Sequence, residues 1–277
     1  MTLLQKLYTT FKLYHLRRFG LDMGVMYRSI RYLPRFIHNY LLYKKMNRKQ
    51  KRGRGGGKGG GGKPNNERHT KVNINPRFDW DKEAGTASGI YFHQDLWASK
   101  KVFAAGPEFH VDVGSRIDGF IAHLLTFTSV KYVDIRPLSS SLPDLEFIQS
   151  DATELNFLED NSVESLSSLN VAEHFGLGRY GDPIDPQGSA KFMKTLQRVI
   201  ADNGRLYFSV PIGMERVEFN AHRVFEPVSV VNEFDKLELL SFSAVVDGDL
   251  VESVEPEDVE LKSRGYDCGL YEFGKCG

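Results

Sequence analysis

Cysteine is scarce in this chain, and long apolar runs are absent from it. The 277 residues include two cysteines, Cys268 and Cys276. A chain long enough to form a large core needs no disulfide between them, so we expect reduced thiols. No run of 18 or more apolar residues occurs, and the N-terminal residues do not resemble a secretory signal peptide. The sequence therefore predicts a cytoplasmic protein without a membrane-spanning helix.

Acidic residues are almost absent from the first 63 positions. This segment holds 16 Lys and Arg and one acidic residue, Asp22, a formal charge of +15. The remaining residues hold 20 basic and 35 acidic side chains, a formal charge of −15, so the net charge of zero hides two parts of opposite sign. Such an asymmetry indicates a basic arm that meets an anionic partner or surface.

The basic segment predicts two amphipathic helices. Apolar residues recur at helical spacing over 2–18 and again over 23–46, with Lys and Arg between them. Pro34 should kink or divide the second helix. Residues 1–63 would then contact an anionic membrane surface, the acidic part of the same chain, or nucleic acid. The periodic apolar faces need burial, which favours a membrane-peripheral arm or docking within the chain over nucleic acid.

Composition divides the chain into three parts. Residues 1–46 are predicted to form the helical extension, 47–75 a flexible Lys/Arg/Gly-rich linker, and 76–277 an α/β domain. In the last part, strands are expected at 109–113, 130–135, 145–149, 163–169 and 205–210, and helices at 93–103, 117–127 and 189–201. This alternation predicts a doubly wound, mostly parallel, seven-stranded sheet, with an antiparallel hairpin of 237–246 and 269–273 at its edge.

A glycine turn and three carboxylates mark the predicted strand ends. Asp112 and Gly114 belong to the first, Asp134 ends the second 22 residues after Asp112, and Asp151 follows the third. Such a turn lets backbone N–H groups face a ligand, and an acidic side chain about 20 residues on can bind ribose hydroxyls. The G-x-G-x-x-G spacing of dinucleotide sites is absent, and no P-loop lysine follows. The turn is therefore neither a dinucleotide fingerprint nor a P-loop.

The order of these features resembles class I S-adenosylmethionine-dependent methyltransferases, over about residues 90–245. The resemblance implies an S-adenosylmethionine site, with Gly114 near the methionine part, Asp134 on the ribose and Asp151 at the adenine. The full predicted cofactor set is Asp112, Gly114, Ser115, Arg116, Gly119, Asp134 and Asp151. The superfamily has further glycines where this chain has Arg116 and Asp118. Arg116 would either obstruct the methionine carboxylate or pair with it.

Three segments carry a narrower resemblance. Residues 91–95, 174–182 and 219–225 are similar to the methyltransferase-like family catalogued as domain of unknown function 268. Because that family has no known substrate, the resemblance implies a fold rather than a reaction.

The loops after the later strands carry many functional side chains. His174 and His222 are candidate bases for an acceptor that must lose a proton, and Glu173 is a candidate to orient His174. The predicted acceptor-binding residues are Arg179, Tyr180, Asp182, Asn220 and Arg223. No metal is expected, because no compact metal motif is formed by the candidate ligands Asp112, Asp134, Asp151, Asp182, Asp185, His174 and His222. The fourth strand also lacks the Asn/Asp-Pro-Pro-Tyr/Phe sequence of nucleic-acid base methyltransferases, which disfavours that substrate.

Three functional hypotheses remain at this stage. The first is methyl transfer from S-adenosylmethionine to a small-molecule or glycan acceptor. The second is a degenerate scaffold, closed by Arg116 and Asp118, whose basic arm binds an anionic membrane or RNA. The third is a sugar-nucleotide enzyme with the same topology.

Overall fold

The structure is a computed structural model that describes residues 23–54 and 72–275. The chain divides into two compact units, Met1–Gly85 and Thr86–Gly277, which are treated separately below. The helix expected at 2–18 lies outside the described residues.

The first unit contains one long helix, α3, which spans Met23–Arg54. Of the kink or division expected at Pro34, the division is wrong, because the helix continues through this residue. The helix ends at Arg54 rather than near position 46. Two ring contacts, Tyr32 with Trp80 at 5.5 Å and Phe36 with Phe78 at 6.1 Å between centroids, hold the later segment along one face of the helix. None of the helices in the described part of the chain combines the length and apolar content needed to cross a bilayer.

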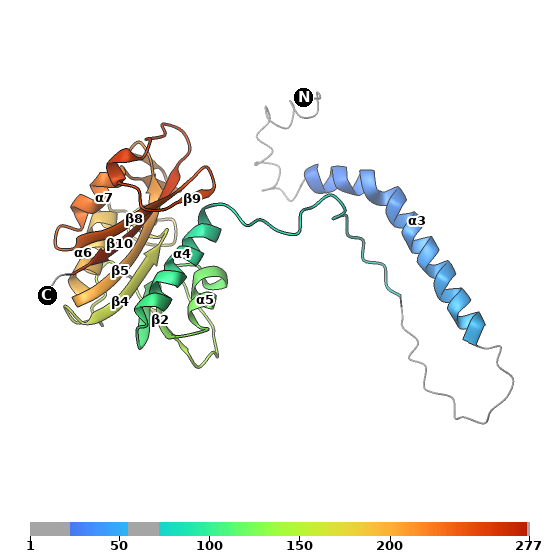
Figure 1. Cartoon of the computed structure of the whole chain (residues 1–277), viewed down its shortest axis with the longest axis horizontal. Helices are drawn as coiled ribbons and strands as arrows, with labels where there is room; N and C mark the ends of the chain where they lie inside the picture. The colour runs from blue at the N-terminus through green and yellow to red at the C-terminus, as the bar shows by residue number, and fades with distance from the viewer. Residues whose placement is uncertain (1–22, 55–71, 276–277) are drawn as a thin grey trace. The chain divides into compact units, whose positions relative to one another are not determined.

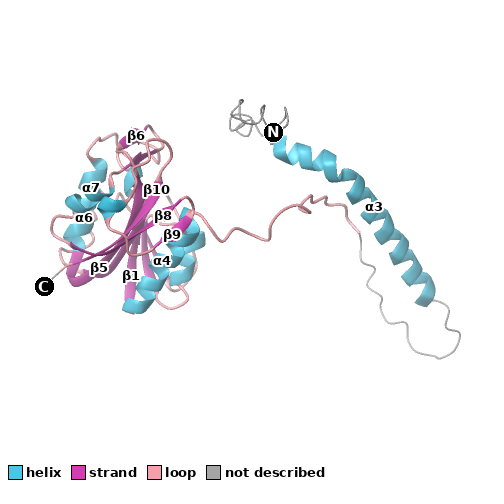
Figure 2. Ribbon diagram, turned by 45° about the horizontal axis from the view of Figure 1, so that its top comes forward, coloured by secondary structure: helices cyan, strands magenta, loops and turns pink. Residues whose placement is uncertain are grey.

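The second unit contains an eight-stranded sheet in the order β3-β2-β1-β4-β5-β10-β8-β9 (Figure 2). The strands are β1 (Phe109–Val113), β2 (Ser129–Asp134), β3 (Leu145–Gln149), β4 (Val163–Leu169), β5 (Ile200–Ile212), β8 (Glu238–Val246), β9 (Asp249–Val251) and β10 (Asp267–Gly274). The pairs among β1 to β5 are parallel, and those among β5, β10, β8 and β9 are antiparallel. The predicted doubly wound, mostly parallel fold with antiparallel edge strands is confirmed. The short β9 makes eight strands where seven were expected.

Helices cover both faces of the sheet (Figure 1). They are α4 (Ile90–Ala105), the irregular turns η1 (Ile117–Ile121) and α5 (Ala122–Leu124) on one face, and α6 (Gly188–Val199) and α7 (Pro227–Glu233) on the other. Each face has its own core: Trp97 and Phe120 are buried with the first group, and Phe192 and Phe234 with the second. The sheet is thus the middle layer of three, and its side chains are covered from both directions.

Two local differences from the predicted elements affect the site. The helix expected at 117–127 begins as the π-helical turn η1, continues as α5 and ends three residues early, at Leu124. A separate two-stranded sheet, β6 (Arg216–Glu218) and β7 (His222–Val224), was not predicted. The β7 strand lies close to the short 3-10 turn η2 (Ala172–His174) through the hydrogen bond from His174 to the carbonyl of Ala221. This hairpin therefore brings the second predicted loop to the first.

Candidate functional site

A cavity of about 190 Å³ lies at the carboxyl ends of β1 to β4. Parallel strands place their following loops at one edge of a sheet, so the loop residues that were predicted separately meet there. Of the predicted site residues, seven line this cavity: Gly114, Arg116, Asp134, Asp151, His174, Tyr180 and Asp182. Asp112, Ser115, Gly119, Glu173, Arg179, Asn220, His222 and Arg223 do not line it.

Asp112 organises the turn after β1 rather than facing the cavity. Its fully buried carboxylate accepts hydrogen bonds from the backbone N–H of Ser115 at 3.0 Å, the Ser115 hydroxyl at 2.6 Å, and the Ser167 hydroxyl of β4. Burial raises the pKa of Asp112 to about 7, although these hydrogen bonds oppose the rise. Asp112 and Ser115 therefore fix the loop that a ligand would meet.

Gly114 makes this turn possible. Its φ of +74° lies in the left-handed region, and an added Cβ would lie 2.8 Å from a methyl carbon of Val171. A side chain at this position would therefore be strained by both backbone conformation and contact. Gly114 lines the cavity directly.

Arg116 points toward an acidic neighbour. Its guanidinium pairs with Asp118 at 3.1 Å and stacks over the Tyr91 ring, 4.7 Å from the centroid. The replacement of the later glycines by Arg116 and Asp118 thus produces an ion pair at the rim of the turn. Gly119 has a different role: an added Cβ would lie 2.0 Å from a carboxylate oxygen of the buried Asp95.

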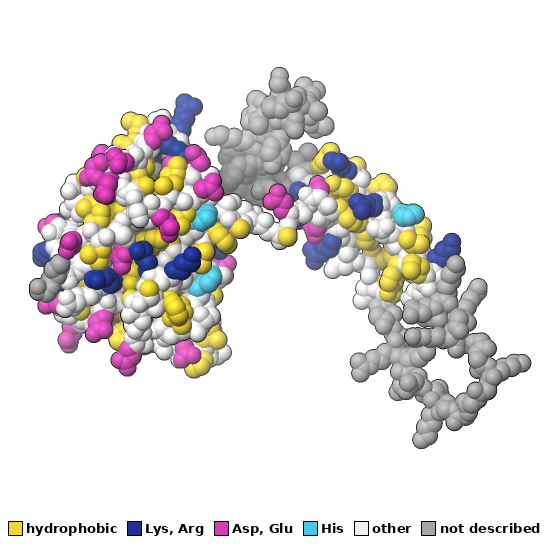
Figure 3. Space-filling view, in the orientation of Figure 1, with side chains coloured by type: hydrophobic (Ala, Val, Ile, Leu, Met, Phe, Trp, Pro, Cys, Tyr) yellow, Lys and Arg dark blue, Asp and Glu magenta, His cyan; other side chains and the backbone are white. Residues whose placement is uncertain are grey.

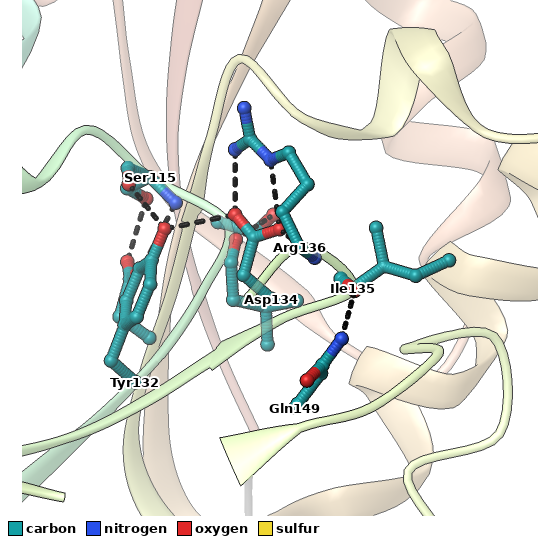
Figure 4. Close-up of polar contacts among 9 residues, drawn as sticks. Ser115, Tyr132, Asp134, Ile135, Arg136 and Gln149 are labelled. Carbon is teal, nitrogen blue, oxygen red and sulfur yellow. Dashed lines mark hydrogen bonds and ion pairs between the residues drawn. The ribbon is translucent and has the colours of Figure 1, made fainter. Parts of the chain in front are cut away.

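Asp134, at the end of β2, is held by the side chain and the backbone of Arg136 (Figure 4). Its Oδ1 accepts from the backbone N–H of Arg136 at 2.8 Å and from the Arg136 Nε at 3.0 Å, and its Oδ2 accepts from Arg136 Nη2 at 2.6 Å. The Tyr132 hydroxyl lies 3.0 Å from Oδ2 and shares its proton with the carbonyl of Ser115. Burial raises the pKa of Asp134, but the Arg136 hydrogen bonds outweigh it, so this pKa lies below its usual value.

The lone pairs of the Asp134 carboxylate are consequently all engaged. A carboxylate offers about four acceptor positions, and four donors point at this one. Two of the four donors belong to the Arg136 guanidinium. Because the Arg136 side chain is 53% exposed, this group can move away from the carboxylate. If it left, two adjacent acceptor positions, one on each oxygen, would become available.

Asp151 lies in the exposed turn after β3. One carboxylate oxygen accepts from the backbone N–H of Thr153 at 2.9 Å and from its hydroxyl at 2.8 Å. Asp151 lines the cavity beside Asp134, as the predicted adenine contact requires.

Glu173 and His174 form a neutral pair beside the cavity. His174 Nδ1 donates to the Ala221 carbonyl at 2.8 Å, which leaves Nε2 with its lone pair. That nitrogen lies 3.7 Å from a carboxyl oxygen of Glu173, whose other oxygen, Oε2, is buried without a hydrogen-bond partner. Burial raises the pKa of Glu173 to about 8, and burial together with the charge of Arg179 lowers the pKa of His174 to about 4. At neutral pH the contact therefore joins an uncharged acid and an uncharged base rather than two ions.

Tyr180 connects two guanidinium groups. The guanidinium carbon of Arg136 lies 4.7 Å from the Tyr180 ring centroid, and that of Arg179 lies 5.1 Å from it. Arg179 donates to the Ala221 carbonyl at 2.8 Å. Among the described residues, no carboxylate forms an ion pair with Arg179.

The other predicted acceptor residues have different surroundings. Asp182 accepts from the backbone N–H groups of Gly176, Gly178 and Tyr180, so its carboxylate holds the loop closed. Arg223 is buried, and its guanidinium donates to the carbonyls of Phe175 and Pro186. Asn220 is exposed, and the His222 ring lies 4.9 Å from that of Tyr266. An acceptor role for Arg223 would require it to give up these carbonyls.

Sequence reasoning missed several residues that line the cavity, among them Arg136 and Asn170. Arg136 stands two positions after Asp134, and at this spacing the arginine side chain can fold back onto the carboxylate. The sequence alone could therefore have indicated Arg136. Asn170 follows β4, and its side chain donates to the buried Gln94 at 2.7 Å. That contact joins residues 76 positions apart, so only the folded chain shows it.

The family comparison agrees with the resemblance found in the sequence. Residues 134–260 match the model of a family described as "Caenorhabditis protein of unknown function, DUF268". No curated protein sequence matches the chain.

Two solved structures are similar to this chain. The N-methyltransferase NodS from Bradyrhizobium japonicum WM9 is similar with a TM-score of 0.50 and 11% identity, over 67% of this chain and 96% of that one. A putative methyltransferase from Bacillus halodurans C-125 has a TM-score of 0.46 and 14% identity, over 65% of this chain and 99% of that one. The likeness to NodS establishes a methyltransferase-type fold for the second unit.

Proposed function

We propose that this chain transfers a methyl group from S-adenosylmethionine to a small-molecule or glycan acceptor. One observation carries the proposal. A glycine turn after β1 and a strand-end carboxylate on β2, Gly114 and Asp134, line one cavity in a sheet of the methyltransferase order. The fold supports the same activity, but fold alone does not define a reaction.

The residues present fit the adenosyl group. The Asp134 carboxylate accepts two hydrogen bonds from the Arg136 guanidinium. The two neighbouring hydroxyls of a ribose could donate two hydrogen bonds to the same positions. Gly114 would hold the methionine part, and Asp151 has a carboxylate oxygen that accepts no protein hydrogen bond and can take the adenine amino group. Val133, Ile135 and Leu169 supply apolar lining for a flat base.

The bound donor would supply an electrophilic methyl group, and the chain's own residues would position and deprotonate the acceptor. His174 lines the cavity with a neutral ring whose Nε2 lone pair can take a proton. Arg179 helps to keep that ring uncharged, and the Ala221 carbonyl fixes which nitrogen carries the proton. Glu173, protonated at neutral pH, can orient the ring without competing as a charged base.

The two alternative functions can be distinguished from methyl transfer by the ligand that the protein binds. A degenerate scaffold would bind no adenosyl ligand, and a sugar-nucleotide enzyme would prefer a nucleotide sugar. The pairing of Arg116 with Asp118 supports an open turn and so favours the methyltransferase. We also propose a cytoplasmic setting, in which the buried thiol of Cys268 stays reduced.

Calorimetric titration tests the proposal. The purified full chain is titrated with S-adenosylhomocysteine, S-adenosylmethionine, NAD and a uridine diphosphate sugar. We expect micromolar binding of the two adenosyl ligands, about −8 kcal/mol, and none of the others. Preferential binding of the nucleotide sugar would replace the proposal with the sugar-nucleotide enzyme, and no binding of any ligand would support the scaffold.

A further inference from the structure

We infer that the acceptor carries a carboxylate or phosphate group, which binds Arg136 and Arg179 beside Tyr180 once the adenosyl ribose occupies Asp134. The inference rests on the proposed function, because the ribose is what releases Arg136. It assigns Arg136 a role that its present contact with Asp134 conceals.

The first step is the exchange at Asp134. The ribose hydroxyls need the two acceptor positions that Arg136 Nε and Nη2 occupy at 3.0 and 2.6 Å. The backbone N–H of Arg136 can keep its bond to Oδ1 while the guanidinium leaves. Arg136 then loses its ion-pair partner, while its contact with the Tyr180 ring offers a place to remain.

The second step is the balance of charge around Tyr180. Arg179 already lacks a carboxylate partner among the described residues, so the exchange produces a second unpaired guanidinium near the same ring. Two of the neighbouring acids do not compensate for this charge. Asp182 is engaged by three backbone N–H groups, and Glu173 is protonated.

The third step concerns the ligand that such a site selects. Guanidinium groups bind carboxylate and phosphate with paired hydrogen bonds, and two of them beside one ring favour an anion. His174 lies within the field of both groups, since Arg179 and Arg136 each lower its pKa. An anionic group held there would place the rest of the acceptor beside the His174 ring, which lines the same cavity.

The exchange also predicts that the two ligands bind cooperatively. The anion site is incomplete while Arg136 is bound to Asp134, so the adenosyl ligand and the anion should each tighten the binding of the other. Coupling of this kind is commonly about 5-fold or more.

The test measures S-adenosylhomocysteine affinity for the full chain in chloride, in inorganic phosphate and in D-glucuronate at equal ionic strength. We expect at least one of the two probes to tighten binding severalfold, and the one that does so identifies phosphate or carboxylate as the anion. Arg179→Gln should abolish the tightening. Arg136→Gln should also abolish it, and should raise the affinity in chloride because the competitor for Asp134 is removed.

Arg205→Gln is the matched control, since Arg205 lies in the first half of β5 with a 4.0 Å contact to Glu272 and does not line the cavity. It should behave as the wild type. Equal affinity in all three salts, or tightening that persists in Arg179→Gln, would overturn the inference alone. Absence of any S-adenosylhomocysteine binding would overturn the proposed function and the inference together.

A separate observation concerns α3, for which we propose an anionic lipid surface as the partner. An apolar stripe of Met26, Ile30, Leu33, Ile37 and Leu41 repeats every three or four residues along one face (Figure 3). All five side chains are exposed, Ile30 by 68% and Leu41 by 59%. The aromatic face with Tyr32 and Phe36 packs elsewhere, on Trp80 and Phe78, so it does not cover the stripe.

The charge of α3 and its apolar stripe together favour an anionic bilayer over nucleic acid as the partner. The sequence of α3 contains ten Lys and Arg and no acidic residue. Nucleic acid would satisfy the charge but leave the apolar stripe in water, whereas an anionic bilayer surface accepts both. The long side chains of Arg28 and Arg31 can extend toward lipid phosphates while the stripe enters the headgroup region, whereas the Arg35 guanidinium lies 5.0 Å from the Trp80 ring centroid.

Vesicle sedimentation of the full chain tests this second proposal. We expect binding to phosphatidylcholine vesicles that contain phosphatidylserine, and little binding to phosphatidylcholine alone. The double variant Ile30→Gln and Ile37→Gln should lose most of the binding, and Arg28→Gln with Arg31→Gln should weaken it. Retained binding in the stripe variant, or a stripe-dependent dimer by ultracentrifugation without vesicle binding, would overturn it.

Discussion

The Arg136 guanidinium donates to both carboxylate oxygens of Asp134, from Nε at 3.0 Å and from Nη2 at 2.6 Å. The two residues are two positions apart at the end of β2, so the pair forms locally. It occupies the carboxylate that the proposed function assigns to ribose. Ligand binding at this site is therefore an exchange of donors, and its free energy depends on what the released guanidinium gains.

Replacement of Asp134 by Asn should weaken S-adenosylhomocysteine binding about 10- to 100-fold. The variant keeps the side-chain shape but removes the charge that strengthens two hydrogen bonds, worth roughly 1.5 to 3 kcal/mol each at most. Calorimetric titration measures the change. Asp144→Asn, an exposed acid before β3, is the control and should bind as the wild type. Equal affinity of the Asp134 variant and the wild type would show that the ribose does not bind this carboxylate.

Replacement of Gly114 by Ala should destabilise the second unit by about 1 to 3 kcal/mol and weaken adenosyl binding. The causes are the φ of +74° and the 2.8 Å approach of the new Cβ to Val171. Gly265→Ala separates these causes, because Gly265 has a φ of +71° and no atom within 4 Å of an added Cβ. Denaturant unfolding gives the free energies. The cost at Gly114 should exceed that at Gly265, and Val171→Ala should recover part of the difference; equal costs would exclude the contact with Val171.

Replacement of Glu173 by Gln should stabilise the protein increasingly as the pH rises from about 4.5 to about 8. Burial raises the pKa of Glu173 to about 8 in the folded chain, against 4.5 for an ordinary glutamate. Between these values the folded state holds a proton that the unfolded state has released, so a higher pH favours unfolding of the wild type. At roughly 1.4 kcal/mol per pKa unit, the full difference above pH 8 is roughly 3 to 5 kcal/mol.

Unfolding curves at several pH values measure this difference. Glu159→Gln, at an exposed position, should show no comparable growth with pH. A Glu173→Gln difference that is constant between pH 5 and 8 would mean that the buried carboxyl does not hold its proton.

The His174 ring should remain neutral, with its proton on Nδ1, from about pH 5.5 to 8. Burial and the Arg179 charge lower its pKa to about 4, and the Ala221 carbonyl accepts from Nδ1 at 2.8 Å. Nitrogen NMR of the labelled imidazole reports both the charge and the tautomer. Titration of this ring between pH 6 and 7 would show that burial and Arg179 do not lower its pKa in this way.

The location of the cavity was predictable, because it follows from the strands. The strand expected at 163–169 has the same bounds in the structure, and parallel pairing brings Asp134 and Asp151 to one edge. The contacts that each side chain makes in the site were less predictable. Asp112 is turned inward by Ser167, a residue 55 positions away that becomes its neighbour when β4 pairs with β1. Local spacing could have indicated Arg136, whereas the burial of Arg223 depends on carbonyls from a distant loop.

The most direct test of the account is the distance between the Asp134 carboxylate and the ribose hydroxyls in a crystal structure with S-adenosylhomocysteine. The account predicts both hydroxyls within hydrogen-bonding distance of the two carboxylate oxygens, at about 2.5 to 3.0 Å. It also predicts the Arg136 guanidinium displaced from Asp134 and still beside Tyr180. A bound ligand whose ribose lies elsewhere, with Arg136 still paired to Asp134, would contradict the account.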